Sequence, residues 1–326
     1  MQKRTIGTST LAVAPLAFGG NVFGWTVDEP TAFSLLDAFV DAGFNLIDTA
    51  DIYARWVPGN RGGESETIIG RWLRQRGNGL RDRVVIATKG GSAMDPNSRK
   101  KDLSRPYLLG AVDDSLRRLG IDCIDLYQSH YDDPDTPVEE TLETYAHLVK
   151  AGKIRYVGAS NFTPARLAES LAVSRQHGYP AYVSLQPEYN LYNRAGFEAE
   201  LLPLCREHHL GVLNYYALAS GFLTGKYRSA ADLGQSPRGR SVQKYLDDRG
   251  FRILAALDEV AAQYRTTPAS VAIAWLLGRP AVSAPIASAT SLAQLDALLG
   301  AARLTLDAPA VKRLDEASEW AGKLEG

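Results

Sequence analysis

The chain has 326 residues, with 36 Lys and Arg against 37 Asp and Glu, so its formal net charge is −1. This balance argues against a nucleic-acid-binding protein, which needs a basic excess or a basic face. The two cysteines, Cys123 and Cys205, exclude a disulfide scaffold and favour a reducing compartment. The N-terminus has no long apolar run after its charges, and no stretch approaches about 18 uninterrupted apolar residues, so neither a signal peptide nor a membrane span is expected. We therefore expect a soluble, cytoplasmic globular protein.

Short apolar runs alternate with longer segments of helical period along the chain. Eight of these runs are predicted strands, at residues 16–18, 44–47, 84–88, 123–127, 154–157, 182–185, 211–215 and 282–286. Apolar residues three and four apart predict the first helix over 32–40, and Gly43 follows it as a C-terminal glycine does. Thr163 and Thr267 precede prolines and predict helix starts, and the segment Thr136–Glu139 predicts a capping box.

Eight strand–helix units without an internal linker favour a closed (β/α)8 barrel over an open sheet. We expect the barrel to take in residues 1–326 as one domain, with further helices near 291–300 and 308–320. The longest irregular stretch, 225–250, is too long for a plain connection and reads either as a binding loop or lid or as a solvated insertion.

Reactive side chains follow three consecutive predicted strands, where a barrel enzyme carries its site. Asp48 and Tyr53 follow the second strand, Lys89 the third and His130 the fourth. Taken singly, each has another explanation: a turn or cap carboxylate, a packing tyrosine, a solvated lysine, a structural histidine. Taken together, they favour a catalytic site.

These four residue types suit proton transfer to a developing alkoxide. A tyrosine with a pKa near 10 is a poor acid or base at neutral pH, but a neighbouring ammonium lowers that pKa. A carboxylate keeps the lysine charged, and a histidine hydrogen-bonds the substrate carbonyl. None of these side chains is a source of electrons, so a reduction needs a bound hydride donor.

Four segments in the right order carry a resemblance to a known family. Residues 44–53, 121–130, 152–162 and 221–226 resemble signatures of the aldo-keto reductase superfamily. The likeness covers nearly the whole chain. It implies an NAD(P)(H)-dependent enzyme that reduces an aldehyde or ketone to an alcohol, with a tetrad of Asp48, Tyr53, Lys89 and His130. Tyr53 is then the general acid, Lys89 paired with Asp48 tunes it, and His130 orients the carbonyl.

The same resemblance implies further binding residues. The cofactor side includes a carboxamide group of residues, a stacking tyrosine, a pyrophosphate loop and segments after the first and last strands: Ser160, Asn161, Gln186, Tyr215, Leu218, Ser220, Leu223, Lys226, Gly19, Gly20, Ile286, Ala287, Ser288 and Gln294. The substrate side comprises Asn21, Trp25, Trp56 and Asp132, and the loop 54–63 is expected to form a substrate wall or else a solvated connection.

Departures from the family pattern leave the choice between NADP(H) and NAD(H) open. Tyr216 and Ala217 stand where the family has Ser-Pro, and Ala297 and Leu298 stand where it has Glu-Asn. The segment 286–294 has no Lys or Arg for a 2′-phosphate. The long loop offers four basic residues that could supply this charge: Arg228, Arg238, Arg240 and Lys244.

Other functions remain open beside carbonyl reduction. One is a sugar or alcohol dehydrogenase that works mainly in the oxidative direction with NAD. Another is a cofactor-sensing regulatory subunit, such as the potassium-channel β subunits that resemble this superfamily. A third, a metal-dependent hydrolase, needs clustered ligands, but no two of the five histidines follow successive strands. We therefore expect a small carbonyl or alcohol substrate, with no metal, nucleic acid or membrane partner.

Overall fold

Eight parallel strands form the centre of the computed structural model, which describes residues 2–95, 98 and 100–320. They follow one another around the sheet in the order β10-β3-β4-β5-β6-β7-β8-β9. Val212 on the last strand of this order pairs in parallel with Val282, just before the first, so the sheet closes on itself. The fold is the predicted (β/α)8 barrel. The strands are β3 (Ala17–Gly19), β4 (Leu46–Asp48), β5 (Val85–Gly90), β6 (Ile124–Ser129), β7 (Ile154–Ser160), β8 (Tyr182–Gln186), β9 (Gly211–Val212) and β10 (Ile286–Ala287).

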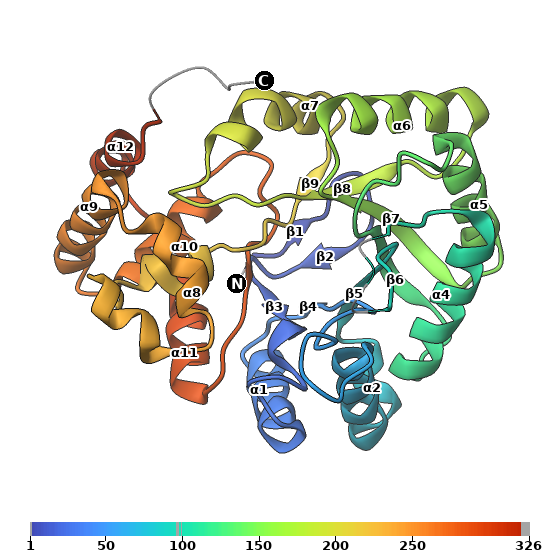
Figure 1. Cartoon of the computed structure of the whole chain (residues 1–326), viewed down its shortest axis with the longest axis horizontal. Helices are drawn as coiled ribbons and strands as arrows, with labels where there is room; N and C mark the ends of the chain where they lie inside the picture. The colour runs from blue at the N-terminus through green and yellow to red at the C-terminus, as the bar shows by residue number, and fades with distance from the viewer. Residues whose placement is uncertain (1, 96–97, 99, 321–326) are drawn as a thin grey trace.

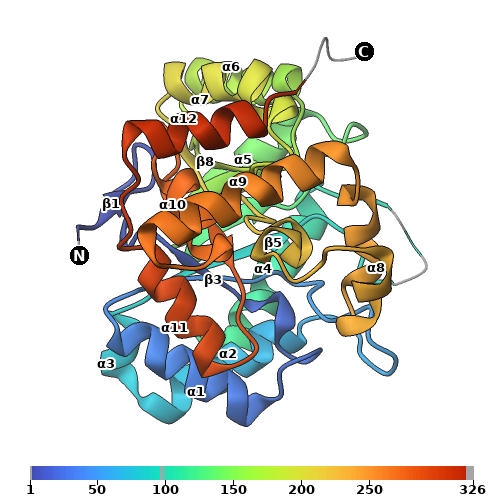
Figure 2. The ribbon, with the colours of Figure 1, turned by 90° about the vertical axis from the view of Figure 1, so that its left-hand side faces the viewer.

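Helices surround the strands, as Figure 1 shows. The helices that follow the strands are α1 (Glu29–Asp41), α2 (Glu64–Arg76), α4 (Arg105–Leu119), α5 (Val138–Lys150), α6 (Pro164–His177), α7 (Leu202–Glu207), α10 (Pro268–Leu277) and α11 (Leu292–Ala301). A short α3 (Asn78–Arg81) follows α2. Two further helices, α9 (Asp248–Tyr264) and α12 (Ala308–Ala317), pack on each other at the outside of the barrel (Figure 2). No helix in the described part of the chain is long and apolar enough to cross a membrane.

An antiparallel hairpin that the sequence pattern did not predict precedes the first barrel strand. Its strands are β1 (Arg4–Thr5) and β2 (Ala12–Val13). Ile6, Leu11 and Val13 are buried in one apolar cluster with residues from six barrel strands and the segment before β10. The hairpin therefore closes the barrel at the end of the strands opposite to the reactive residues, and the core at this end excludes water.

The helix ends follow from local sequence, with one exception. Gly43 has a φ of +90° just after α1, and the side chains of Thr163 and Thr267 accept the expected N-terminal hydrogen bonds. The capping box predicted at 136–139 is wrong. Helix α5 begins at Val138 after Pro137, and the Thr136 hydroxyl donates instead to the Asp133 carboxylate at 2.5 Å.

The long segment 225–250 is less irregular than predicted. It contains three short helical segments, η4 (Ala230–Gln235), α8 (Gly239–Val242) and η5 (Gln243–Tyr245), and ends inside the first turn of α9. Residues 235–238 of this segment line the large cavity described below. The segment therefore forms part of the wall of this cavity, and its role as a binding loop stays a prediction.

Candidate active site

The buried ion pair of Lys89 and Asp48 lies at the centre of the site. Asp48 ends β4 and Lys89 lies near the end of β5, so neighbouring parallel strands bring the two side chains together. The Lys89 ammonium is 0% exposed and donates to Asp48 Oδ2 at 2.7 Å, to the Thr49 carbonyl at 2.8 Å and to Tyr53 Oη at 2.9 Å. All three of its N–H groups are used, so its position is fixed.

Two glutamine side chains hold the other oxygen of Asp48. Gln186 Nε2 donates to Asp48 Oδ1 at 2.9 Å, and Gln128 Nε2 donates to it at 3.4 Å. Gln186 Nε2 also lies 3.1 Å from Gln128 Oε1. This polar network joins β4, β5, β6 and β8 across the barrel. Sequence reasoning missed Gln128, although its place near the end of a strand beside Lys89 and Gln186 was a usable signal.

Burial determines the protonation of the tetrad. It raises the pKa of Tyr53 well above the ordinary value, and the nearby Asp48 carboxylate raises it further. Burial also lowers the pKa of Lys89, an effect that Asp48 opposes. The expected lowering of the tyrosine pKa is therefore wrong, because burial and the nearby Asp48 carboxylate raise it. Tyr53 carries its proton at neutral pH.

His130 follows β6 and lies beside Tyr53, with 6.1 Å between the ring centroids. Its backbone N–H donates to the Gly90 carbonyl at 2.8 Å, which anchors it to the neighbouring strand. Burial lowers the pKa of its imidazole well below 6.5, and Lys89 adds to the effect. His130 is therefore neutral, with one ring N–H to offer a ligand.

A cavity of about 950 Å³ opens above the tetrad. It extends past the ends of β7 and β8 to the loop after β9 and the start of α11. Its lining includes most of the predicted residues: Gly19, Asn21, Asp48, Tyr53, Trp56, His130, Ser160, Asn161, Gln186, Tyr215, Leu218, Ser220, Lys226, Ile286, Ala287, Ser288 and Gln294. Residues from distant parts of the chain thus meet in one elongated hollow large enough for a small ligand.

The predicted carboxamide-binding residues form a connected group in this cavity. Asn161 Nδ2 donates to the His130 carbonyl at 2.9 Å and to Ser160 Oγ at 3.0 Å. The Tyr215 hydroxyl donates to Asn161 Oδ1 at 2.7 Å. Ser160 in turn donates to the Gln186 carbonyl at 2.9 Å. In this state the side chain of Asn161 is bonded at both ends.

Of the four basic residues of the long loop that were candidates for a 2′-phosphate, Arg238 lines the cavity, and Lys226 of the same segment lines it as well. One of its terminal guanidinium nitrogens is buried without a hydrogen-bond partner, and the guanidinium lies 5.3 Å from the Trp25 ring centroid. Of the other candidates, Arg228 is paired with Asp258 and Lys244 lies over the Tyr245 ring. A guanidinium nitrogen buried without a hydrogen-bond partner at a cavity wall is suited to an anionic ligand.

Besides the buried Lys89, four predicted binding residues do not line the cavity. Gly20 is not part of the cavity wall, and its carbonyl accepts a hydrogen bond from the Ser65 hydroxyl. Leu223 is buried in the apolar core. Asp132 points instead to Arg166, 2.8 Å away. Trp25 lies behind the wall, against Trp56 and Arg238. For Asp132 and Trp25, a position in a loop near the site did not determine where the side chain points, and the binding roles of all four residues stay predictions.

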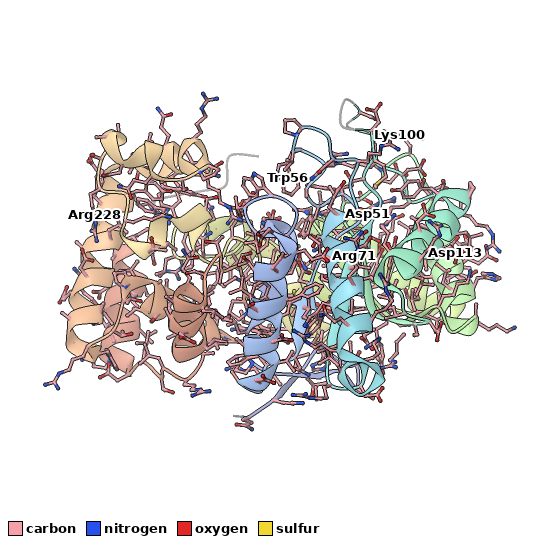
Figure 3. The ribbon with its side chains drawn as sticks, turned by 90° about the horizontal axis from the view of Figure 1, so that it is seen from below. Asp51, Trp56, Arg71, Lys100, Asp113 and Arg228 are labelled. Atoms are coloured by element: carbon pink, nitrogen blue, oxygen red, sulfur yellow. The ribbon has the colours of Figure 1, made fainter. Side chains whose placement is uncertain are left out.

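Two aromatic residues that were missed do line the cavity: Tyr131 and Tyr216. Tyr131 stacks on His130, and Tyr216 is 47% exposed. Trp56, predicted for this wall, is 46% exposed and stands on the rim of the molecule (Figure 3). Each missed tyrosine directly follows a predicted site residue. That adjacency was the usable signal, because consecutive residues of the loop after a barrel strand can both face the site.

The comparison with protein families identifies this arrangement. A family model described as Aldo/keto reductase family matches residues 15–319. The chain belongs to the aldo/keto reductase family. Among curated aldo/keto reductase relatives, the uncharacterised oxidoreductase YrpG of Bacillus subtilis (strain 168) is 34% identical over 321 residues, which cover 97% of this chain and 95% of that protein.

Two further aldo/keto reductase relatives differ in their names. The L-glyceraldehyde 3-phosphate reductase of Escherichia coli (strain K12) is 33% identical over 303 residues, 91% of this chain and 86% of that protein. A probable voltage-gated potassium channel subunit beta of Arabidopsis thaliana is 34% identical over 304 residues, 90% of this chain and 89% of that protein. Aldo/keto reductases of this kind are oxidoreductases of small molecules with nicotinamide cofactors. Within the described residues, no group of three or more His, Cys, Asp or Glu side chains could hold a metal ion.

Proposed function

We propose that this protein is an NAD(P)H-dependent reductase that converts an aldehyde or ketone into an alcohol. The arrangement of Lys89 between Asp48 and Tyr53, at the base of a cavity of about 950 Å³, carries the proposal. It combines a protonated phenol, a fixed cation and room for two ligands side by side. The chemistry of this set is proton donation to an oxygen that becomes negatively charged.

Tyr53 is the proposed general acid. Burial keeps its hydroxyl protonated, and the Lys89 ammonium at 2.9 Å stabilises the phenolate left after the proton has gone to the substrate oxygen. Asp48 balances the buried charge of Lys89 and holds it in line with the phenol. The proton thus moves from Tyr53 Oη to the alkoxide, and the fixed ammonium stabilises the resulting charge without rearrangement.

His130 is the proposed orienting residue. Its neutral imidazole offers one N–H to the carbonyl oxygen that Tyr53 protonates, so the two rings define where that oxygen lies. The aromatic side chains of Trp56, Tyr131 and Tyr216 line the cavity and would pack against the remainder of the substrate.

The residues of the cavity fit a nicotinamide dinucleotide. Ser160, Asn161 and Gln186 would hold the carboxamide, and Tyr215, whose hydroxyl donates to Asn161 Oδ1, would stack on the nicotinamide ring. Lys226 and the unpartnered nitrogen of Arg238 suit phosphate groups. When bound, the reduced cofactor supplies the hydride. Among the described residues that line the cavity, the lysines and arginines are Lys226 and Arg238, and the segment 286–294 has none; we therefore propose that Arg238 strengthens NADP(H) binding.

The same site also runs in reverse, with the Tyr53 phenolate accepting the proton of an alcohol. A dehydrogenase that uses NAD is therefore an alternative of the same mechanism. The relative named as a potassium channel subunit favours a second alternative, a cofactor-sensing regulatory subunit. Turnover separates them, since a sensor binds the cofactor without multiple rounds of reaction.

The test follows nicotinamide absorbance at neutral pH with a panel of aldehydes and ketones, and at alkaline pH with alcohols and NAD or NADP. Fluorescence titration with NADPH and NADH accompanies it. We expect cofactor binding below about 1 mM, the upper range of ordinary substrate affinities, and turnover of at least one carbonyl. Absence of binding below that concentration would overturn the proposed function. Binding without turnover of any carbonyl or alcohol would support the sensor instead.

A further inference from the structure

Three side chains, those of His130, Tyr131 and Lys101, form a stack beside the tetrad. The His130 and Tyr131 rings are nearly parallel, with 4.9 Å between centroids and 17° between planes. The Lys101 ammonium lies 3.4 Å from the centroid of the Tyr131 ring. A cation at this distance over a ring face is attracted by the ring electrons. The order along the stack is therefore Lys101, Tyr131 and His130, and both rings line the cavity.

The backbone holds Lys101 in this position. Ser92 and Lys101 form an antiparallel bridge, and the neighbouring Ala93 N–H donates to the Lys100 carbonyl at 3.0 Å. Within the described part of the chain, no carboxylate lies within ion-pair distance of the Lys101 ammonium. The adjacent Lys100 behaves differently: its ammonium lies 3.0 Å from Asp102, and its side chain is on the outer rim (Figure 3). Two successive lysines thus have two different environments.

His130 is the residue that this charge affects. The charged and titratable groups around it are Tyr53 and Arg55 from the loop after β4, Lys89 from β5, Lys101 from the segment after β5 and Tyr131 from its own loop. The nearest acids are engaged elsewhere, Asp48 with Lys89 and Asp132 with Arg166. His130 is therefore surrounded by cations.

The hydrogen bonding of the His130 ring nitrogens also favours the neutral imidazole. Nδ1 is buried and has no hydrogen-bond partner among the described residues. A protonated imidazole would carry a second N–H at this atom, and a buried N–H without an acceptor is costly. The neutral ring with its hydrogen on Nε2 avoids this cost and keeps one N–H donor.

We propose that Lys101, acting through the Tyr131 ring, is a positioning residue that keeps His130 neutral and holds its ring at the angle needed to orient the substrate carbonyl. The catalytic role of this orientation rests on the proposed function. The stack itself is a property of the free protein, and it can be tested without turnover.

The test measures the titration of His130 by NMR in histidine-labelled free protein, with the signal assigned from its loss in His130→Asn. Removal of the charge in Lys101→Met is expected to increase the ratio of protonated to neutral His130 about threefold at a fixed acidic pH, and Lys101→Glu about tenfold, as for a unit charge acting over several ångströms. Lys101→Arg keeps the charge and should resemble the wild type. Lys100→Met is the matched control, since it removes the same charge one residue away and should leave the signal unchanged.

A second variant and a second readout complete the experiment. In a Tyr131→Leu background, Lys101→Met should no longer change the titration of His130. In the active enzyme, the acid limb of the pH profile of kcat/KM should move to higher pH in Lys101→Met and return in Lys101→Arg. Equal titration in wild type, Lys101→Met and Lys101→Glu would overturn the inference, as would an equal effect of Lys100→Met. If the NMR titration gives the expected result while no carbonyl is reduced, the proposed function is wrong but the inference about Lys101, Tyr131 and His130 is supported.

Discussion

Replacing Asp48 by Asn tests whether the ion pair with Lys89 is the buried structural centre of the site. Lys89 is 0% and Asp48 2% exposed, so the substitution leaves an ammonium in the interior without its carboxylate. Breaking a buried pair in this way costs about 3–5 kcal/mol of folding free energy. For a chain of this length, that cost corresponds to a fall in Tm of roughly 5 °C, on the usual entropy of unfolding per residue.

The stability of the Asp48→Asn variant is also expected to depend on pH, through the titration of Lys89. Burial lowers the pKa of Lys89 below 10.5, and the carboxylate of Asp48 opposes this. In Asp48→Asn the folded-state pKa falls further, while the unfolded chain keeps the ordinary value. Below that value the unfolded state then binds more protons, so the stability of the variant rises with pH from neutral towards 10, more steeply than that of the wild type.

The assay is denaturant unfolding of both proteins at several pH values. The matched control is Asp113→Asn, which removes a carboxylate from an exposed pair with Lys153 on the outer surface (Figure 3) and should cost less than about 1 kcal/mol. If Asp48→Asn is as stable as Asp113→Asn and shows the wild-type dependence on pH, the buried charge of Lys89 is not what this geometry implies.

Three further substitutions test other parts of the structure. Arg238→Gln should weaken NADPH binding about tenfold, as expected for loss of a charge-assisted hydrogen bond; in fluorescence titration, an equal loss with NADH assigns the arginine to phosphates that both cofactors share, and no loss with either contradicts its role. Gly90→Ala places a Cβ 2.0 Å from the buried Tyr127 hydroxyl and should cost about 1–3 kcal/mol in denaturant unfolding, where an unchanged midpoint would contradict the packing. Burial raises the pKa of Asp51 to about 8, and the nearby Glu66 raises it further, so this carboxyl destabilises the fold increasingly as pH rises from about 4 to 8. Asp51→Asn should therefore be more stable than the wild type by about 1 kcal/mol or more at pH 8, but not at pH 4. A difference in stability that is the same at both pH values would refute the assignment.

The barrel and the tetrad were predictable because both depend on local patterns repeated in order. Apolar runs of strand length marked all eight strands, and residues directly after them met at one end of the barrel, as parallel pairing requires. The hairpin of β1 and β2 escaped prediction because each strand has only two residues, too few for a period to be visible. Its role depends on contacts with strands far along the chain.

Side-chain direction was less predictable than position. Asp132 lies in a loop next to the site, yet it pairs with Arg166 from another helix, and Thr136 binds Asp133 rather than capping α5. The first outcome depends on a partner far along the chain, and the second on a local competitor, since Asp133 lies only three residues before Thr136. Arg238 was one of four candidates of equal standing, and only the path of the 225–250 segment distinguishes it. The reducing, cytoplasmic location stays a prediction.

The most direct test of the account is the reduction of a carbonyl substrate by Tyr53→Phe under single-turnover conditions, with cofactor binding measured in parallel. The substitution removes one hydroxyl and keeps the ring that packs on Trp56 and His130. We predict that the rate of reduction falls by about 10² or more, as for loss of a general acid, while the Kd of NADPH changes little. An unchanged rate would show that Tyr53 does not supply the proton, and the central claim would be wrong.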